Sequence, residues 1–327
     1  MCNPIDLPSK FLGSMVGSAL GDAIGELAFR YNTETDLRRV VARRNLLAYT
    51  DDTAMAIGLA QSLTHYHGLD PQHLGQTFHA NYLREPWRGY ASGPPTIFQA
   101  VEREGLSYAA AARRLFGGSG SYGNGAAMRV APLGLFYYDA DPSTLYDQAR
   151  RSASVTHAHP IAIDGAAVLA TAVARAVALD PTVPFAFETF AQALIEAART
   201  SELRERVTRA CDLARQDASP KQAAWRWELG DSVAMHHSLP FALYAYLRHP
   251  DDFEACLMCA ALYGGDRDTL AAMACAISGA ALGIDAIPPD WRVKLENRAE
   301  IENLARGLVE TRNGNTKDAK EQNGAMG

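Results

Sequence analysis

Four glycines recur at intervals of four residues near the start of the chain, in the segment GSMVGSALGDAIG: they are Gly13, Gly17, Gly21 and Gly25. In an α-helix this spacing places all four on nearly one face. A glycine inside a helix costs roughly 1 kcal/mol relative to alanine, so the pattern needs a compensating gain, and close approach of another backbone supplies one. A second pair of small residues, Gly279 and Gly283, ends a later apolar segment. We therefore expect these two helices to pack against each other at the centre of one domain.

Helical periodicity extends over nearly the whole chain. Apolar residues recur at spacings of three and four, whereas alternating runs of β-branched residues are nearly absent. The sequence therefore predicts a compact all-α fold, with helices at about 8–24, 51–66, 71–84, 94–103, 107–115, 125–136, 143–155, 160–178, 187–198, 201–215, 238–248, 250–261, 267–283 and 297–310. The stretch YNTETDLRRVVARR, residues 31–44, is expected to be a polar connection. Because no linker divides the sequence, we expect one domain over residues 1–310 and a polar, flexible tail over 311–327.

Composition and charge narrow the choice of partner and compartment. With 48% apolar and 21% charged residues, the chain of 327 residues is typical of a globular protein. A net charge of −6 gives no attraction to nucleic acid or to an anionic membrane, so a small or a neutral-to-cationic partner fits better. The longest nearly uncharged stretch, residues 271–284, is shorter than the roughly 18–20 residues of a membrane span. Five cysteines, an odd number, and a start without an apolar signal segment favour reduced thiols in the cytoplasm.

Residues 49–55 read YTDDTAM and place two adjacent carboxylates directly before an apolar helical segment. One explanation is helix capping: Thr50 is a good N-cap residue, and Asp51 and Asp52 in a first turn complement the helix dipole. The alternative is a binding site for a cation. Taken alone, this motif favours capping.

A second acidic motif, GGDRDT at residues 264–269, precedes another apolar helix. Asp266 and Asp268 are two residues apart in a turn, where both side chains can converge, and Thr269 adds a hydroxyl. Capping is again the alternative. Together the two motifs form an all-oxygen set, which suits Mg²⁺ or Mn²⁺ and lacks the His and Cys ligands that zinc prefers. Because burying so many carboxylates without a cation would be very costly, we favour a site for two metal ions.

These motifs and three others together resemble the ADP-ribosyl-glycohydrolase family, of the type that acts on dinitrogenase reductase. The resemblance extends from the first helix to about residue 284, and the motifs occur in family order: GSALGDAIG, YTDDTAM, GSYGNGAAMRVAPLGL, SVTHAHP and ALYGGDRDTLAAMACAISGAALG. It implies an all-α domain with a binuclear Mg²⁺ centre at the base of a central cleft. The metal ligands that it implies are Thr50, Asp51, Asp52, Asp266, Asp268 and Thr269.

The glycine-rich loop GSGSYGNG, residues 118–125, resembles the family segment that wraps the diphosphate and ribose of ADP-ribose. Its glycines expose backbone N–H groups, and the predicted helix after it would direct a positive end toward phosphate. The substrate-binding residues implied here are Gly120, Ser121, Tyr122, Gly123 and Asn124, with His157 of SVTHAHP at the border of the cleft. The alternatives are a plain flexible loop and a structural histidine.

Two positions depart from the family pattern. Many members carry a glutamate where this chain has Phe29. Glu26 lies three residues earlier, on the same face of a continuing helix, and is the candidate to replace it as acid or base. Arg267 stands between two of the implied ligands, where a small polar residue is usual, and we expect it at the rim of the cleft.

The resemblance implies a Mg²⁺-dependent hydrolase that releases ADP-ribose from a modified acceptor, and a protein side chain is the expected acceptor. Asp51 or Asp266 would assist the attacking water, with Glu26 as a further acid/base candidate. Two alternatives remain open. One is a hydrolase of another ADP-ribosyl nucleotide or ester, and the other is a homologue that binds ADP-ribose, or has a structural role, without catalysis. Retention of all six ligand positions argues against the second alternative, and Phe29 argues for it.

Overall fold

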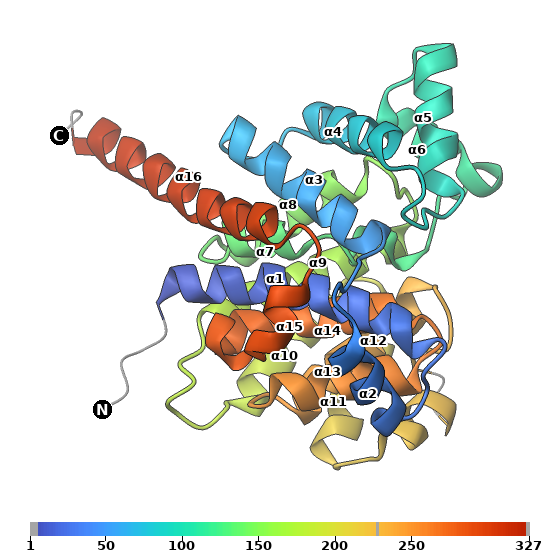
Figure 1. Ribbon diagram of the computed structural model, residues 1–327. Helices are drawn as coiled ribbons and strands as arrows, with labels where there is room; N and C mark the ends of the chain where they lie inside the picture. The colour runs from blue at the N-terminus through green and yellow to red at the C-terminus, as the bar shows by residue number, and fades with distance from the viewer. Residues whose placement is uncertain (1–5, 227–228, 325–327) are drawn as a thin grey trace.

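The computed structural model describes residues 6–226 and 229–324, and within these ranges the chain forms helices and no β-strand, which confirms the all-α prediction. Figure 1 shows α1 crossing the middle of the molecule, with other helices on both sides of it. The α-helices are α1 (Leu7–Ala28), α2 (Glu34–Arg43), α3 (Asp51–Tyr66), α4 (Pro71–Arg84), α5 (Gly93–Glu104), α6 (Tyr108–Arg114), α7 (Ala131–Phe136), α8 (Pro142–Ala153), α9 (Pro160–Val177), α10 (Phe187–Ala197), α11 (Ser201–Arg215), α12 (Met235–Arg248), α13 (Phe253–Tyr263), α14 (Arg267–Leu282), α15 (Pro289–Lys294) and α16 (Arg298–Gly324). Short 3₁₀ and π segments connect some of them: Leu115–Gly118, Asn124–Ala126, Gln222–Arg226 and Ile284–Ala286.

Helices α1 and α14 pack against each other, as their glycines predict. A Cβ atom on Gly13 would lie 2.3 Å from the carbonyl oxygen of Gly279, and one on Gly21 would lie 2.3 Å from that of Ala271. Since both distances are shorter than any real Cβ contact, a side chain at either position would push the two backbones apart. The glycines therefore fix how closely the ends of the two helices approach each other.

This contact places the acidic turn at the start of α14 beside the second half of α1. Asp22 of α1 is fully buried and accepts hydrogen bonds from the backbone N–H groups of Thr50 (3.0 Å) and Thr53 (3.0 Å) and from Thr53 Oγ1 (2.6 Å). These bonds attach the beginning of α3 to the middle of α1. Three helices therefore meet at the two acidic motifs.

Helix α2 lies where the sequence analysis expects a polar connection. The Thr33 side chain caps it by accepting a hydrogen bond from Asp36 N (3.2 Å), and its buried residues are Leu37 and Val41, four positions apart. Because only two residues form its apolar face, the surrounding charges hide the helical pattern.

The helix predicted over residues 125–136 is interrupted, so this prediction is wrong. Asn124–Ala126 form a single 3₁₀ turn, and α7 begins only at Ala131, with a proline in its first turn. The segment before α7 is instead tied to residues 233–235: Asn124 N donates to Val233 O (2.9 Å), and Met235 N donates to Tyr122 O (3.0 Å). The glycine-rich loop therefore lacks the helix N-terminus that was expected to face a phosphate.

Helix α9 lies in the core and packs against α7, α8, α10 and α14. By length and composition alone it is apolar enough to cross a membrane, a stretch that the sequence analysis overlooks, but 72% of it is buried inside the protein. That burial is typical of the core helix of a globular fold. The cysteines in the described ranges are also buried in the interior, as free thiols: Cys211, Cys256, Cys259 and Cys275.

The C-terminal helix α16 includes residues 311–324 of the region that we expect to be a polar, flexible tail. Figure 1 shows its last turns extending away from the other helices. Residues 325–327 of the predicted tail lie outside the described part of the chain.

Candidate active site

The two acidic motifs form the first turns of α3 and α14. Thr50 caps α3, since its side chain accepts a hydrogen bond from Asp52 N at 3.4 Å. Asp266 occupies the N-cap position of α14, but its side chain makes no capping bond there. Capping therefore accounts for Thr50 and leaves the gathering of carboxylates unexplained.

Burial and mutual repulsion raise the pKa of the carboxyl groups in this cluster. Burial is the main cause, and it raises the pKa of Asp51 to about 7, with repulsion from Asp22 acting in the same direction. The pKa of Asp268 rises to about 8 through burial and then through Asp266. Asp52 is 3% exposed, and its pKa lies well above the usual value for the same reasons. The neighbouring protein groups therefore do not stabilise all of these carboxyl groups in their charged form.

The donor atoms of the cluster suit a divalent cation. They are carboxylate and hydroxyl oxygens, and Asp52 Oδ2 is buried without any hydrogen-bond partner. Within residues 6–226 and 229–324, no three His, Cys, Asp or Glu side chains are already grouped closely enough to hold one ion. The carboxylates thus lie near enough to shift one another's pKa, but they would have to move closer to share a cation.

The glycine-rich loop is attached to the second acidic motif. Asn124 is buried, and its Nδ2 donates to Asp266 Oδ2 at 2.5 Å. Gly123 N donates to Ser121 Oγ at 3.2 Å, which shapes the turn between them. Gly120 has a φ of +73°, and a Cβ there would lie 2.7 Å from that of Ala158, so the position requires glycine. The loop is therefore held firmly, and Asn124 orients an aspartate of the cluster.

Tyr122 is the exposed aromatic residue of this loop, with a relative solvent exposure of 50%. The ring lies 5.7 Å from that of His159 and 6.2 Å from that of His236. These three aromatic rings come from distant parts of the sequence, which is why the sequence analysis assigns no common role to them.

His157 and Arg129 support the loop from within the core. A Cβ atom on Gly125 would lie 3.0 Å from His157 Cε1, and His157 Nδ1 lies 2.7 Å from Thr156 Oγ1. Burial lowers the pKa of His157 to about 3, and the Arg129 charge acts in the same direction, so the imidazole is neutral. We therefore find His157 under the loop, as a packing and hydrogen-bonding group.

Arg129 is a site residue that the sequence analysis missed. It is fully buried and donates to Gly125 O (2.7 Å) and Thr156 Oγ1 (2.7 Å), while its charge lowers the pKa of Asp51. The available signal was a lone arginine in the apolar run MRVAPLGL, because an isolated charge there needs buried partners. Asp22 was missed as well, although it lies within the GDAIG motif.

The end of α1 carries the proposed replacement for the family glutamate. Glu26 is exposed in the last turns of the helix, and it contributes, after burial and the neighbouring aspartates, to the raised pKa of Asp268. Phe29 follows the helix and is 48% exposed. Arg267, which we expect at the rim of the cleft, instead donates to the carbonyl oxygens of Ala28 (2.5 Å) and Gly264 (3.3 Å). Its guanidinium therefore holds the end of α1 against the start of α14.

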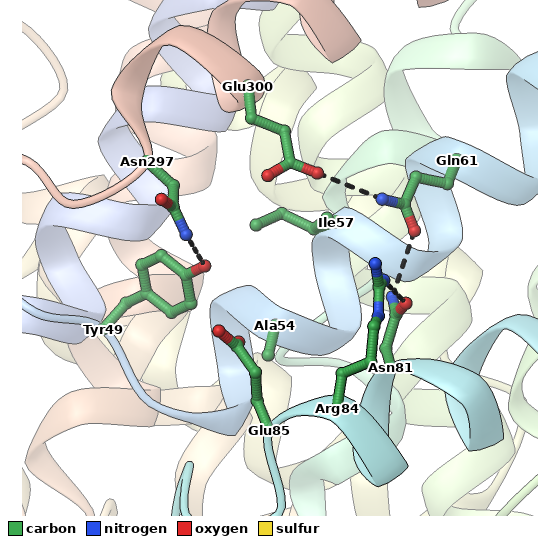
Figure 2. A pocket seen from close by; sticks show the side chains of 9 residues that line it. All are labelled: Tyr49, Ala54, Ile57, Gln61, Asn81, Arg84, Glu85, Asn297 and Glu300. Carbon is green, nitrogen blue, oxygen red and sulfur yellow. Dashed lines mark hydrogen bonds between the residues drawn. The ribbon is translucent and has the colours of Figure 1, made fainter.

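A cavity of about 130 Å³ lies next to the acidic turn of α3 (Figure 2). Its polar side chains bond one another: Gln61 donates to Glu300 (3.1 Å), and Asn297 donates to the Tyr49 hydroxyl (2.8 Å). Arg88, which is buried beside it, donates to Tyr49 O (3.1 Å) and to a carboxylate oxygen of Glu296 (2.7 Å). The polar side chains of this cavity are therefore already paired with one another. Their hydrogen bonds connect α3, α4 and α16 and hold Tyr49, the residue before Thr50, in place.

Comparisons with known proteins assign the chain to a family. The family model described as ADP-ribosylglycohydrolase matches residues 3–318. ADP-ribosylhydrolase ARH3 of Homo sapiens is 32% identical over 341 residues, covering 92% of this chain and 93% of that protein. ARH3 of Bos taurus is also 32% identical, covering 92% of each chain. A solved structure of an ADP-ribosylglycohydrolase-related protein complex superposes with a TM-score of 0.69 at 26% identity, covering 94% of this chain and 99% of that chain.

These matches extend over nearly the whole chain and include both acidic turns and the loop attached to them. The chain therefore belongs to the ADP-ribosylglycohydrolase family, and it is a glycosidic hydrolase that removes ADP-ribose.

Proposed function

We propose that this hydrolase cleaves the bond between ADP-ribose and a modified protein side chain, and that it depends on Mg²⁺. The observation that carries the proposal is the meeting of two acidic turns beside Asp22, next to a loop whose Asn124 donates to Asp266. A glycosidic hydrolase needs carboxylates beside the bond that it breaks, and this cluster supplies them.

Six residues would hold the metal ions: Thr50, Asp51, Asp52, Asp266, Asp268 and Thr269. Two bound Mg²⁺ ions, or Mn²⁺ in their place, would orient the ribose hydroxyls beside the bond that is broken, and the carboxylates of the cluster would favour positive charge on the sugar in the transition state. The unpaired Asp52 Oδ2 and the mutual repulsion of the aspartates support this proposal, because a cation would satisfy both.

The side chains around the cluster would position the reactants. The segment from Gly120 to Asn124 would bind the diphosphate through the backbone N–H groups of Ser121 and Tyr122, because the other three donate to protein oxygens, and Tyr122 would cover the ribose or the adenine. Asn124 fixes the orientation of Asp266 through its hydrogen bond. Asp51 or Asp266 would then accept a proton from the attacking water, and Glu26 is the candidate to protonate the leaving acceptor.

A second candidate function is binding of ADP-ribose without catalysis. The observation that favours it is Phe29, which stands half-exposed at the end of α1, where the family resemblance leads us to expect a glutamate. Under this alternative the protein would keep its affinity for ADP-ribose and release none from any substrate.

The experiment that separates these functions measures release of ADP-ribose from peptides modified on arginine or on serine, and from ADP-ribosyl nucleotides and esters. Each substrate is incubated with Mg²⁺ and with a chelator. We expect turnover of at least one modified peptide with Mg²⁺ and little with chelator. Binding of ADP-ribose without turnover of any substrate would favour the non-catalytic alternative. Turnover of nucleotides or esters alone would show that the acceptor is not a protein side chain.

The same proposal places the protein in the cytoplasm, where ADP-ribose or an ADP-ribosylated protein would be its partner. The buried free thiols of the described residues support a reducing compartment. Detection of the protein mainly in a secreted or membrane fraction would contradict this location.

A further inference from the structure

A cavity of about 220 Å³ lies between the last turns of α1 and residues 44–48. Its charged lining residues are Glu26, Arg30 and Arg44, and its apolar walls include Leu27, Leu46 and Leu47. It adjoins the acidic cluster along the chain, because two residues that also line it, Ala23 and Ala48, lie one residue after Asp22 and two residues before Thr50. The cavity is therefore a positively charged space beside a strongly acidic one.

The two arginines are available to a ligand. Neither guanidinium has a hydrogen-bond or ion-pair partner in the described parts of the chain, residues 6–226 and 229–324, although Glu26 lines the same cavity. By contrast, Arg88 and Arg267 nearby both donate to specific protein oxygens. Unpaired guanidinium groups in a partly enclosed space favour an anionic ligand.

The helix dipole does not prevent an anion from binding there. The cavity lies at the C-terminal end of α1, where unpaired carbonyl groups normally disfavour negative charge. Arg267 offsets this effect, since it donates to the Ala28 carbonyl at 2.5 Å. The charge of the cavity is therefore determined by its own side chains: the two positive charges of Arg30 and Arg44 and the one negative charge of Glu26.

The position of the cavity indicates which part of a substrate it would meet. The glycine-rich loop is attached to Asp266 through Asn124, so ADP-ribose is expected on that side of the cluster. Glu26, which lines the cavity, follows Gly25, and a Cβ atom on Gly25 would lie only 2.5 Å from the Cα atom of Asp268, so the cavity lies on the Asp268 side of the cluster. A group that enters the cavity would thus belong to the acceptor and not to the diphosphate.

We propose that this cavity is an acceptor subsite, which binds the side-chain carboxylate of an acidic residue close to the ADP-ribosylated residue of a protein. The inference rests on the proposed function of the neighbouring cluster. Leucine walls suit the methylene groups of Asp or Glu, and the two guanidinium groups suit the carboxylate. The cavity offers no helix N-terminus or glycine-rich loop of the kind that surrounds a phosphate, so a peptide carboxylate fits better.

The test uses two ADP-ribosylated peptides that differ only in having Glu or Ala beside the modified residue. For the parent protein we expect a KM about tenfold lower for the Glu peptide, the scale of one charge-assisted hydrogen-bonded pair, with similar kcat. The Arg30→Ala/Arg44→Ala variant should lose this preference, and the corresponding double lysine variant should recover part of it. Arg43→Ala, an exposed charge outside the cavity, is the matched control and should keep the preference. Equal KM ratios in the parent and the double alanine variant would overturn the proposal.

A binding measurement separates this proposal from the proposed function. Fluorescence anisotropy follows the unmodified Glu and Ala peptides on the full chain with ADP-ribose present. Preferential binding of the Glu peptide, lost in the double alanine variant, would support the subsite even if the parent hydrolysed nothing. Equal affinity for both peptides, no binding of either, or stronger binding of inorganic phosphate by the two arginines would overturn it.

Discussion

At the scale of single residues, the substitution of Phe29 for the family glutamate makes Glu26 the residue to test. Helix α1 continues beyond Gly25 to Ala28, so Glu26 stays on a helical turn, and its charge acts on Asp268 after burial and the neighbouring aspartates. If Glu26 transfers the proton, Glu26→Gln should lower kcat by roughly 10²-fold, the usual scale for a general acid or base, with little change in affinity for ADP-ribose. Steady-state kinetics on the best modified peptide measures it.

The Phe29 position supplies the matched comparison for this prediction. Phe29→Glu restores the family residue and should return activity to a Glu26→Gln background, whereas Phe29→Leu keeps an apolar side chain and should not. A Glu26→Gln variant with parental kcat would show that Glu26 only solvates the end of the helix.

At the scale of secondary-structure elements, the contact between α1 and α14 is the feature most sensitive to substitution. A Cβ on Gly13 would lie 2.3 Å from the backbone oxygen of Gly279, so Gly13→Ala must separate the helices. We expect the free energy of unfolding to fall by about 2 kcal/mol or more, because overpacking outweighs the helix propensity of alanine. Urea denaturation of the two proteins measures the difference.

Gly307→Ala on α16 is the control for this substitution. Its Cβ would lie 3.4 Å from Thr64 Cγ2, which is an ordinary van der Waals contact. The variant should gain up to about 1 kcal/mol from helix propensity. Equal effects of the two substitutions would mean that backbone contact does not explain the glycine pattern.

The local sequence pattern predicted a helix correctly where the residues that it marks as apolar are also the ones that pack in the core. The bounds of α3, Asp51–Tyr66, follow from the Thr50 cap and the apolar run after it. Helix α2 was missed because Leu37 and Val41 alone form its buried face. The interruption after Asn124 depends on a hydrogen bond to Val233, a contact between distant segments that no local pattern reveals.

The same distinction applies to the candidate site. Both acidic motifs were visible in the sequence, because each places two carboxylates directly before an apolar helical segment. The buried Arg129 and the capping role of Asp22 depend on partners far along the chain, so the sequence alone did not assign them. Likewise, only the structure shows that Asn124 donates to Asp266.

At the scale of the whole molecule, the acidic cluster makes stability depend on pH. Burial and repulsion raise the pKa of Asp51 to about 7 and of Asp268 to about 8 in the folded protein, so the native state binds more protons than the unfolded state up to about pH 8. The free energy of unfolding of chelator-treated protein should therefore fall as the pH rises from about 6.5 to 8. His157, with a pKa of about 3, acts in the opposite direction only below about pH 6.5.

Urea denaturation at several pH values in this window checks the prediction. Asp52→Asn removes one charge from the cluster and should flatten the decrease. If the free energy of unfolding of the parent protein stays constant or rises between pH 6.5 and 8, the pKa values of these carboxyl groups are not raised in the folded protein.

The central claim is that the two acidic turns form one cation site, and calorimetric titration of Mg²⁺ tests it most directly. Chelator-treated parent protein, Asp51→Asn and Asp266→Asn are titrated under the same conditions, with circular dichroism to confirm that each remains helical. We expect Mg²⁺ to bind the parent and each substitution to remove most of that binding, since both residues belong to one charge cluster. Unchanged Mg²⁺ affinity in both variants would contradict the claim and leave the two motifs as the first turns of α3 and α14 only.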